Sequence, residues 1–190
     1  MIRILGISGS LRAGSYNTAL LRAAQSAAGP GIDFEIATLH GIPLYDADLE
    51  SRDGLPTAVT VLKEKIVASD GVLLATPEYN NGIPGVFKNG IDWLSRPPSD
   101  IPLVFGGRAF ALIGASPGGF GTILAQNAWL SVLRTLGVRY WMGGRLLASR
   151  ASQLFGPDGQ LEDDKVRAQL DKFVAGFAAF AKPEIAGGRS

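Results

Sequence analysis

Continuous apolar runs of strand length alternate along the chain with segments whose apolar residues follow helical spacing. The runs cover residues 2–8, 34–39, 71–76 and 109–115, and a shorter one lies near residues 138–147. Strands that are apolar throughout, rather than at every second position, are typical of sheets buried on both faces. The pattern therefore predicts parallel strands covered by helices on both sides.

Two segments place their apolar residues on one helical face. In the earlier segment this face comprises Leu55, Val59, Leu62 and Ile66. In the later segment it comprises Val166, Leu170, Phe173, Phe177 and Phe180. Residues three and four apart share a face of an α-helix, so we expect both helices to pack on the sheet. The remaining residues, 182–190, are predicted to form a frayed tail.

Five strands separated by helices predict a three-layer α/β fold with a five-stranded parallel sheet in the flavodoxin-like order 2-1-3-4-5. We expect residues 1–190 to form one domain. Residues 41–49 and 95–108 are predicted to be connecting loops, because prolines, aspartates and paired glycines interrupt their apolar pattern. In such sheets ligands bind beyond the carboxyl ends of the strands, so the loops after strands one, three and four are the candidates.

Composition narrows the class of protein. The chain has 190 residues, of which 46% are hydrophobic, and a net charge of +1 from 18 basic and 17 acidic residues. This balance gives no reason to expect a nucleic acid as partner. No secretory signal and no stretch of membrane-spanning length is evident, so we expect no membrane span and a cytoplasmic location.

Most side chains that catalyse reactions directly are scarce. The chain contains no cysteine and one histidine, His40. Thiolate nucleophiles, disulfides and zinc clusters are thereby excluded, and no metal site is expected. We expect His40 to face solvent at a strand end. Any chemistry must come largely from a bound group.

The first loop follows the strand at residues 2–8 and leads into a helix. It offers the hydroxyls of Ser10 and Ser15, the amide of Asn17 and the guanidinium of Arg12. A helix N-terminus with such donors favours an anion, although Ser and Asn are also ordinary helix caps. Neither the Walker pattern nor the G-x-G-x-x-G dinucleotide fingerprint is present.

The second loop opens the stretch TPEYNNGIPGVFKNGIDWLSR, residues 76–96, and the third lies within GASPGGFGT, residues 114–122. The second offers an aromatic face, amides and backbone N–H groups, which suit a flat heteroaromatic ring, while its alternative interpretation is an ordinary turn. Pro84 is expected near the start of the following helix. The glycines of the third loop permit close approach to a ligand. Together the loops predict a site for a mononucleotide with a large planar ring.

The segments GSLRAGSYN, residues 9–17, and TPEYNNGIPGVFKNGIDWLSR resemble the NADPH-dependent FMN reductases, a flavodoxin-like group that includes bacterial quinone, chromate and azo-dye reductases. The similarity covers roughly the first two thirds of the chain. It implies FMN as cofactor and NADPH or NADH as co-substrate. The implied phosphate ligands are Ser10, Arg12, Ser15 and Asn17. The implied ring contacts are Pro77, Glu78, Tyr79, Asn80 and Asn81, with Ser116, Gly118 and Gly119 on the other flank.

The resemblance also implies a function. Electrons would pass from NAD(P)H through FMN to quinones or similar small-molecule acceptors such as flavins, chromate or azo compounds, with no titratable catalytic residue. In this setting Glu78 is interpreted as a positioning or inter-subunit residue. The alternatives are a flavodoxin-type electron carrier, which the near-neutral charge disfavours, and a non-catalytic flavin-binding module. Arg12 and Arg108 are candidate partners for the 2′-phosphate of NADPH.

A homodimer formed through the helix after the second loop is implied as well. The apolar stretch IPGVFKNGIDWL, residues 83–94, is compatible with a partner contact, and its alternative interpretation places Phe87, Ile91 and Trp93 in the core. Some relatives carry an Arg and a Tyr after the third loop that hold a tetramer. This chain has ILAQNAWL at residues 123–130 instead. A tetramer is therefore less favoured than a dimer.

Overall fold

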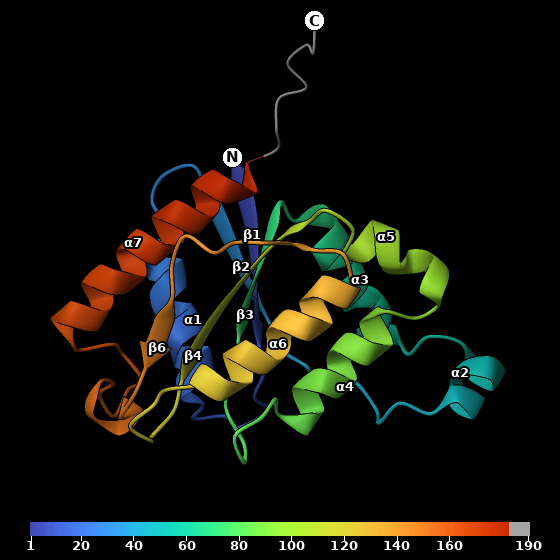
Figure 1. The fold of residues 1–190 in the computed structure, drawn as a ribbon, viewed down its shortest axis with the longest axis horizontal. Coiled ribbons are helices and arrows are strands. Elements are labelled where there is room, and N and C mark those ends of the chain that lie inside the picture. Colours follow the sequence, from blue (N-terminus) through green and yellow to red (C-terminus); the bar gives the residue numbers. More distant parts are fainter. Residues whose placement is uncertain (183–190) are drawn as a thin grey trace, which may run out of the picture.

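A parallel sheet separates two layers of helices in the computed structural model, which describes residues 1–182 (Figure 1). The strand order is β2-β1-β3-β4-β5, and β6 also pairs with β4. The strands are β1 Ile2–Ser8, β2 Ile32–Ala37, β3 Gly71–Ala75, β4 Ala109–Ala115, β5 Arg139–Tyr140 and β6 Leu146–Ala148. The predicted α/β class and the order 2-1-3-4-5 are confirmed. β3 and β4 are buried at every position, as their uninterrupted apolar sequences require.

The fifth strand position differs from the prediction, because two short strands share it. β5 pairs with the first half of β4 and β6 with the second half. Between them the chain leaves the sheet and buries Trp141, whose ring packs edge-on against Phe173 at 4.7 Å between centroids. A Cβ on Gly144 would lie 2.7 Å from this ring, so glycine permits the detour.

The helices form one layer on each face of the sheet. The cluster on one face includes buried side chains of α1 and α7, and the cluster on the other includes those of α3, α4, α5 and α6 (Figure 1). The α-helices are α1 Tyr16–Ser26, α2 Ala47–Asp53, α3 Thr57–Ala68, α4 Gly85–Leu94, α5 Ile101–Val104, α6 Ile123–Thr135 and α7 Asp164–Ala181. Two short 3-10 helices, η1 and η2, cover Pro98–Asp100 and Ala151–Gln153.

Both predicted amphipathic faces are present. In α3 the buried members are Val59, Leu62 and Ile66, and in α7 they are Leu170, Phe173 and Phe177. Leu55 lies outside its helix because Pro56 occupies the N-cap position. Pro84 is likewise the N-cap of α4 rather than its first helical residue. The predicted tail lies, from residue 183 onward, outside the described residues.

The prediction of a loop over residues 95–108 is wrong, because η1 and α5 form there. Pro98 and Pro102 stand in the first turns of these helices, where a missing N–H costs no hydrogen bond. Val104 and Phe105 then anchor the segment in the core. The prediction of a loop over residues 41–49 is correct only as far as Asp46, because α2 begins at Ala47 and the side chain of Asp46 caps it.

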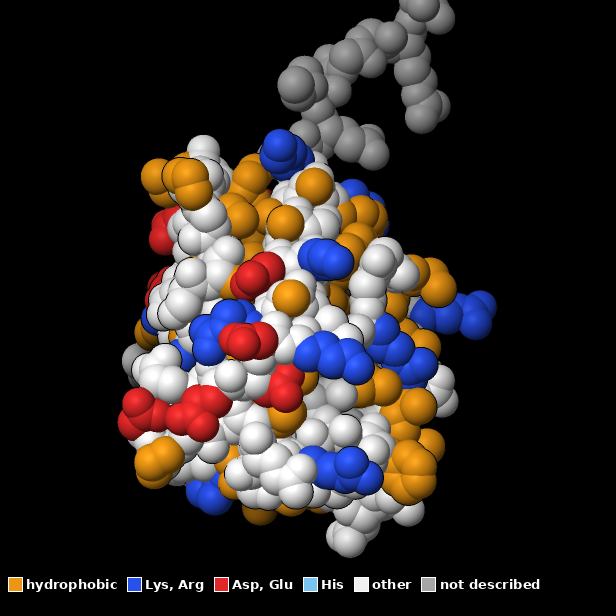
Figure 2. Space-filling view, turned by 90° about the vertical axis from the view of Figure 1, so that its left-hand side faces the viewer, with side chains coloured by type: hydrophobic (Ala, Val, Ile, Leu, Met, Phe, Trp, Pro, Cys, Tyr) orange, Lys and Arg blue, Asp and Glu red, His pale blue; other side chains and the backbone are white. Residues whose placement is uncertain are grey.

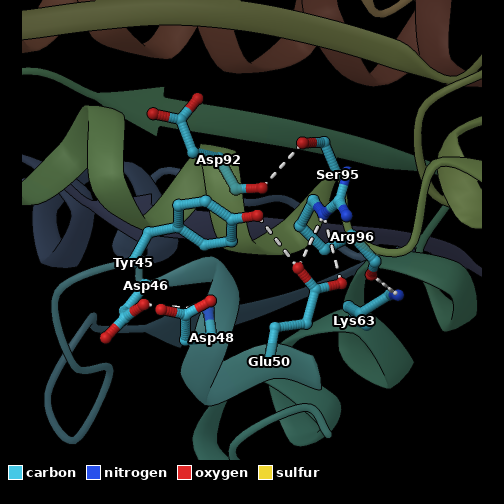
Figure 3. A network of polar contacts seen from close by, with 8 residues as sticks. All are labelled: Tyr45, Asp46, Asp48, Glu50, Lys63, Asp92, Ser95 and Arg96. Atoms are coloured by element: carbon cyan, nitrogen blue, oxygen red, sulfur yellow. Dashed lines mark hydrogen bonds and ion pairs between the residues drawn. The ribbon is translucent and has the colours of Figure 1, made fainter. Parts of the chain in front are cut away.

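Polar side chains fasten α2 to the body of the molecule (Figure 3). Arg96 donates to Glu50 at 2.8 Å, and the hydroxyl of Tyr45 donates to the same carboxylate at 3.0 Å. These bonds hold the pKa of Glu50 below its ordinary value, with Arg96 as the main cause. The buried ammonium of Lys63 donates to Asp100 and, at 2.6 Å, to the carbonyl of Arg96.

The surface carries both signs of charge. Figure 2 shows acidic and basic side chains interspersed on one side of the molecule, some in contact and others separated by uncharged atoms. None of the helices formed by residues 1–182 has the length and apolar character needed to cross a membrane. Within the same residues, no three His, Asp or Glu side chains are grouped so that they could hold a metal ion.

Candidate functional site

The carboxyl ends of β1, β3 and β4 lie at one edge of the sheet, the lower edge in Figure 1, and three loops continue from them. They are the first loop, residues 9–15, the second loop, residues 76–84, and the third loop, residues 116–122. The parallel register aligns Ser8 with Ala75, and Ala75 with Ile113. The three sequence motifs, far apart in the chain, therefore start from adjacent strands.

The first loop turns sharply at the end of β1. A Cβ on Gly9 would lie 2.1 Å from the ring of Phe87, so only glycine lets the loop pass α4. The buried hydroxyl of Ser10 accepts the N–H of Arg12 at 3.3 Å, which shapes the loop from within. Ser15 is the N-cap of α1 and accepts the N–H groups of Asn17 and Thr18. The capping interpretation thus holds for Ser15.

The amide of Asn17 joins the first loop to the end of β4. Its Nδ2 donates to the carbonyl of Ala115 at 2.9 Å, and its Oδ1 accepts the N–H of Ala115 at 2.9 Å. Asn17 is buried, so these two bonds fix the start of α1 against the root of the third loop. Its position supports the site, and the amide is largely occupied by the protein itself.

Several donors of the first loop have no partner in the protein. The backbone N–H groups of Ala13, Gly14 and Tyr16 donate to no acceptor within residues 1–182. The exposed guanidinium of Arg12 lies over the ring of Tyr16, 5.3 Å from its centroid. Because these groups surround the positive end of α1, they could hold an anion.

The second loop contains a tight turn with Asn80 and Asn81 at its two central positions. Tyr79 and Gly82 exchange backbone hydrogen bonds of 3.2 and 3.0 Å, and Asn80 and Asn81 between them have φ of 50° and 62°. Two positive φ values in succession correspond to a type I′ turn, which asparagine tolerates. The turn leaves the N–H groups of Asn80 and Asn81 without acceptors in the described chain, and Tyr79 is 52% exposed.

The root of the second loop is rigidly held. Buried Thr76 accepts the indole N–H of Trp129 at 3.0 Å and donates to the carbonyl of Pro77 at 2.9 Å. The carboxylate of Glu78 accepts the N–H groups of Leu124 and Ala125 at 2.8 and 2.9 Å. Glu78 therefore caps α6, which begins directly after the third loop, and so ties the second loop to the third.

The third loop contacts a fourth loop, residues 149–152, which was not predicted from the sequence. The carbonyls of Ser116 and Gly118 accept hydrogen bonds from the chain after β6: the N–H of Arg150 donates to Gly118 at 2.9 Å and that of Ala151 donates to Ser116 at 3.0 Å. The available signal was the apolar run LLA followed by the small polar residues of SRAS, the same pattern as in the first loop. Arg150 has φ of 52°, a costly conformation for this residue type.

Comparison with known proteins identifies the family to which the chain belongs. Residues 2–153 match the family model "NADPH-dependent FMN reductase". The chain belongs to the NADPH-dependent FMN reductase family. It is 46% identical over 171 residues to an NAD(P)H-dependent FMN reductase of Pseudomonas aeruginosa, with 90% of each chain covered. It is 33% identical over 181 residues to a 2-hydroxy-1,4-benzoquinone reductase of a Burkholderia species, covering 95% of this chain and 97% of the relative.

Solved structures agree with this assignment. A flavoenzyme NAD(P)H:(acceptor) oxidoreductase from Paracoccus denitrificans superposes with a TM-score of 0.84 at 32% identity, covering 95% of this chain and 97% of the other. An archaeal flavodoxin superposes with a TM-score of 0.60 at 10% identity, which shows a shared fold alone. The family resemblance expected from the two motifs is therefore confirmed.

Two expectations about this family member change with the structure. Phe87, Ile91 and Trp93 of α4 are buried in the core of the single chain, so the core interpretation of these residues is correct. Arg108 precedes β4, at the opposite edge of the sheet from the three loops, and its guanidinium donates to the carbonyls of Ser69, Leu103 and Val104. The expectation that Arg108 faces the nucleotide is therefore wrong.

His40 is exposed, as expected. Its Nδ1 lies 3.0 Å from the hydroxyl of Thr38, and its Nε2 lies 3.2 Å from the carbonyl of Leu11 in the first loop. This contact places the histidine beside the first loop.

Proposed function

We propose that this chain is an FMN-dependent NAD(P)H oxidoreductase that delivers electrons to quinones or similar two-electron acceptors. The observation that carries the proposal is that two groups of hydrogen-bond donors without acceptors in the described chain lie on adjacent loops at one edge of the sheet. One set is the helix N-terminus with Arg12, and the other is the Asn80–Asn81 turn. Family membership adds the cofactor class. We further propose that residues 1–190 act as one FMN-binding domain.

The first loop fits a dianionic phosphate. The free N–H groups of Ala13, Gly14 and Tyr16 and the guanidinium of Arg12 are the donors. We assign Ser10 and Ser15 to the same phosphate site, since each hydroxyl already accepts a backbone N–H and still has its own proton to donate. Asn17 orients this loop through Ala115 and is a phosphate ligand only through its second amide proton.

The second and third loops fit a planar ring with polar edges. Pro77 and Tyr79 offer flat surfaces, and the N–H groups of Asn80 and Asn81 are positioned to donate to an electron-rich ring edge. Ser116, Gly118 and Gly119 border the opposite flank, where the absence of large side chains leaves room for the ring. Glu78 holds the two loops together through α6.

FMN held by these residues would supply the redox chemistry, taking a hydride from a nicotinamide and passing electrons to a second substrate. The residues around it orient the ring and stabilise negative charge on it. None of the assigned side chains other than Glu78 is a carboxylate, and that carboxylate already accepts two N–H groups. The chain thus supplies position and electrostatics rather than a proton donor.

Quinones are the acceptor class that we favour. The Burkholderia relative, matched along nearly its whole length, is named for reduction of a hydroxylated benzoquinone. An exposed Tyr79 and a glycine-bordered third loop leave the ring side of the site open to a flat molecule. Because NADPH is a reductant of the cytoplasm, we propose that compartment for the reaction.

We also propose a homodimer, through a surface different from the buried face of α4. Large apolar side chains are exposed around the third loop and α6, where Phe120 is 80% exposed and Met142 is 85% exposed. Leu124 and Leu130 on α6 are 46% and 40% exposed. Light scattering on the protein and on Phe120→Asp measures whether this surface joins two copies.

Anaerobic spectroscopy tests the proposed activity. The protein is loaded with FMN, freed of excess flavin, and mixed with NADPH and then with a benzoquinone. We expect the flavin absorption to bleach with NADPH and to return with the quinone. A bound flavin that NADPH leaves unbleached would indicate an electron carrier or a non-catalytic module. A loop variant, Asn17→Ala, serves as a control with weakened flavin binding.

A further inference from the structure

A recess of about 560 Å³ opens beside the first loop, on the side of the sheet covered by α1. Its volume lies in the range of ligand pockets, roughly 300 to 1,000 Å³. One wall is formed by Gly14, Tyr16 and Arg22, and the other by Ser152, Phe155 and Asp158. The ring-binding residues of the second and third loops do not line it. The recess therefore shares the first-loop residues 13–16 with the proposed phosphate site and adjoins the rest of the flavin crevice there.

The recess has an aromatic wall. Tyr16 is half-buried and stacks on Phe155, with 5.7 Å between the ring centroids and 29° between the planes. Arg12 lies over the ring of Tyr16 and joins this wall to the phosphate loop. A flat heterocycle in the recess would contact an immobilised aromatic surface, an arrangement that stabilises stacking.

Charge in the recess favours an anion. Arg22 is exposed on α1, and its guanidinium pairs with no carboxylate within residues 1–182. Asp158 is the acidic residue of the lining and opposes it. The positive end of α1 and Arg12 are assigned to the FMN phosphate, so Arg22 is the basic side chain of the lining that remains for a second anion. A ligand with a phosphate close to Arg22 and away from Asp158 suits the recess.

We propose that the recess holds the 2′-phosphorylated adenosine half of NADPH, with Arg22 binding the 2′-phosphate and Tyr16 contacting the adenine. This inference rests on the proposed function. A dinucleotide has two ends, and the recess and the flavin crevice share the first loop, so we infer that one extended molecule spans both. Arg22 thereby becomes the residue that distinguishes NADPH from NADH.

Binding of nucleotide fragments tests the recess without any turnover. Calorimetry compares adenosine 2′,5′-bisphosphate with adenosine 5′-monophosphate on the FMN-loaded protein. We expect the bisphosphate to bind at least tenfold more tightly. Arg22→Ala should weaken the bisphosphate by about 10- to 100-fold, as expected for a lost charge-assisted contact, and the monophosphate by less than about twofold. Arg22→Lys should restore part of the affinity.

Two further variants separate the recess from general effects. Arg134→Ala removes another exposed arginine, on α6 across the sheet, and should change neither affinity. Ser152→Trp fills the recess and should weaken both fragments while FMN stays bound. Equal affinity for the two fragments in the wild type, or equal loss of both in Arg22→Ala, overturns the proposal.

Steady-state kinetics then distinguishes this inference from the proposed function. We expect Arg22→Ala to lower kcat/KM for NADPH tenfold or more and to leave that for NADH within about twofold. An enzyme that oxidises both nucleotides with an unchanged ratio in Arg22→Ala would retain the proposed function and refute the recess assignment. A protein that binds the bisphosphate through Arg22 yet oxidises neither nucleotide would refute the function and retain the recess as a nucleotide site.

Discussion

The two edges of the sheet use arginine in opposite ways. At the amino edge Arg108 is half-buried, and three backbone carbonyls at the ends of α3 and α5 accept from its guanidinium. At the carboxyl edge Arg12 is exposed and lies over the ring of Tyr16. Backbone N–H groups of the first loop, at the start of α1 beside it, have no acceptor in the described chain. Burial lowers the pKa of Arg108, which shows the cost of removing its charge from water.

The difference separates a structural arginine from the one that we propose binds phosphate. Carbonyls at helix C-termini carry partial negative charge and need donors, and Arg108 supplies them for two helices at once. The N-terminus of α1 has the reverse need, because its N–H groups await an acceptor. From the sequence, both arginines are candidates for a nucleotide phosphate. The structure distinguishes them, because Arg12 lies at a helix N-terminus and Arg108 at helix C-termini.

The largest expected effect is on stability, from Arg108→Ala. It leaves three partly buried carbonyls without their donor, and we expect the free energy of unfolding to fall by about 2 to 3 kcal/mol. Urea denaturation of the flavin-free protein measures it. Arg3→Ala, an exposed arginine at the same edge, is the matched control and should change stability little. Weakened FMN binding by an Arg108→Ala variant of unchanged stability would contradict the structural role given to Arg108.

Next in size is the loss of FMN affinity in Arg12→Ala. A charge-assisted contact contributes about 1.5 to 3 kcal/mol, so the dissociation constant should rise by roughly 10- to 150-fold. Flavin fluorescence titration measures the constant. The melting temperature of the flavin-free protein should stay unchanged, because Arg12 is exposed. Wild-type affinity in this variant contradicts the phosphate assignment.

A smaller effect is expected from Glu78→Ala. Loss of the cap on α6 should destabilise the protein by about 1 kcal/mol and loosen the link between the second and third loops. Glu78→Gln keeps an oxygen acceptor and should retain most of the stability. Thermal melts and flavin titrations of both variants, side by side, test whether the carboxylate acts through α6. A loss of flavin binding without any loss of stability points to direct contact with the ligand.

The smallest effect concerns acid stability. The pKa of Glu50 is lowered by the hydrogen bond from Arg96, so the ionised form stabilises the fold. This contribution is present above the ordinary pKa of about 4.5 and is lost as pH falls through the lower folded value. Melting temperatures of the wild type should therefore decline more steeply than those of Glu50→Gln below about pH 5. Parallel curves would exclude a stabilising role for this pair.

Much of the fold followed from local pattern. β4 was predicted with its observed bounds, since seven apolar residues in a row suit only a strand buried on both faces. The amphipathic faces of α3 and α7 were equally predictable. The split of the fifth strand was not, because it depends on Trp141 finding space among glycines and Phe173 from α7, far along the chain.

The site divides in the same way. The positions of the first and second loops were evident from their polar, small-residue sequences after apolar strands. The hydrogen bonds that two of their residues make within the protein were not predictable. Asn17 bonds to Ala115, about a hundred residues away, and Glu78 bonds to the start of α6, about fifty residues away. The fourth loop at Arg150 escaped notice because β6 is too short to give a clear periodic signal.

By itself the sequence determined the layered α/β fold, the family and the edge of the sheet at which the three polar loops meet, because periodicity, helix starts and turn residues are local properties. Tertiary structure decided which polar groups are already satisfied. It assigned Arg108 to helix ends, placed Phe87 of α4 inside the core, and left the donors around Arg12 unfilled. Whether a side chain is available for a ligand depends on partners distant in sequence, and only folding brings those partners together.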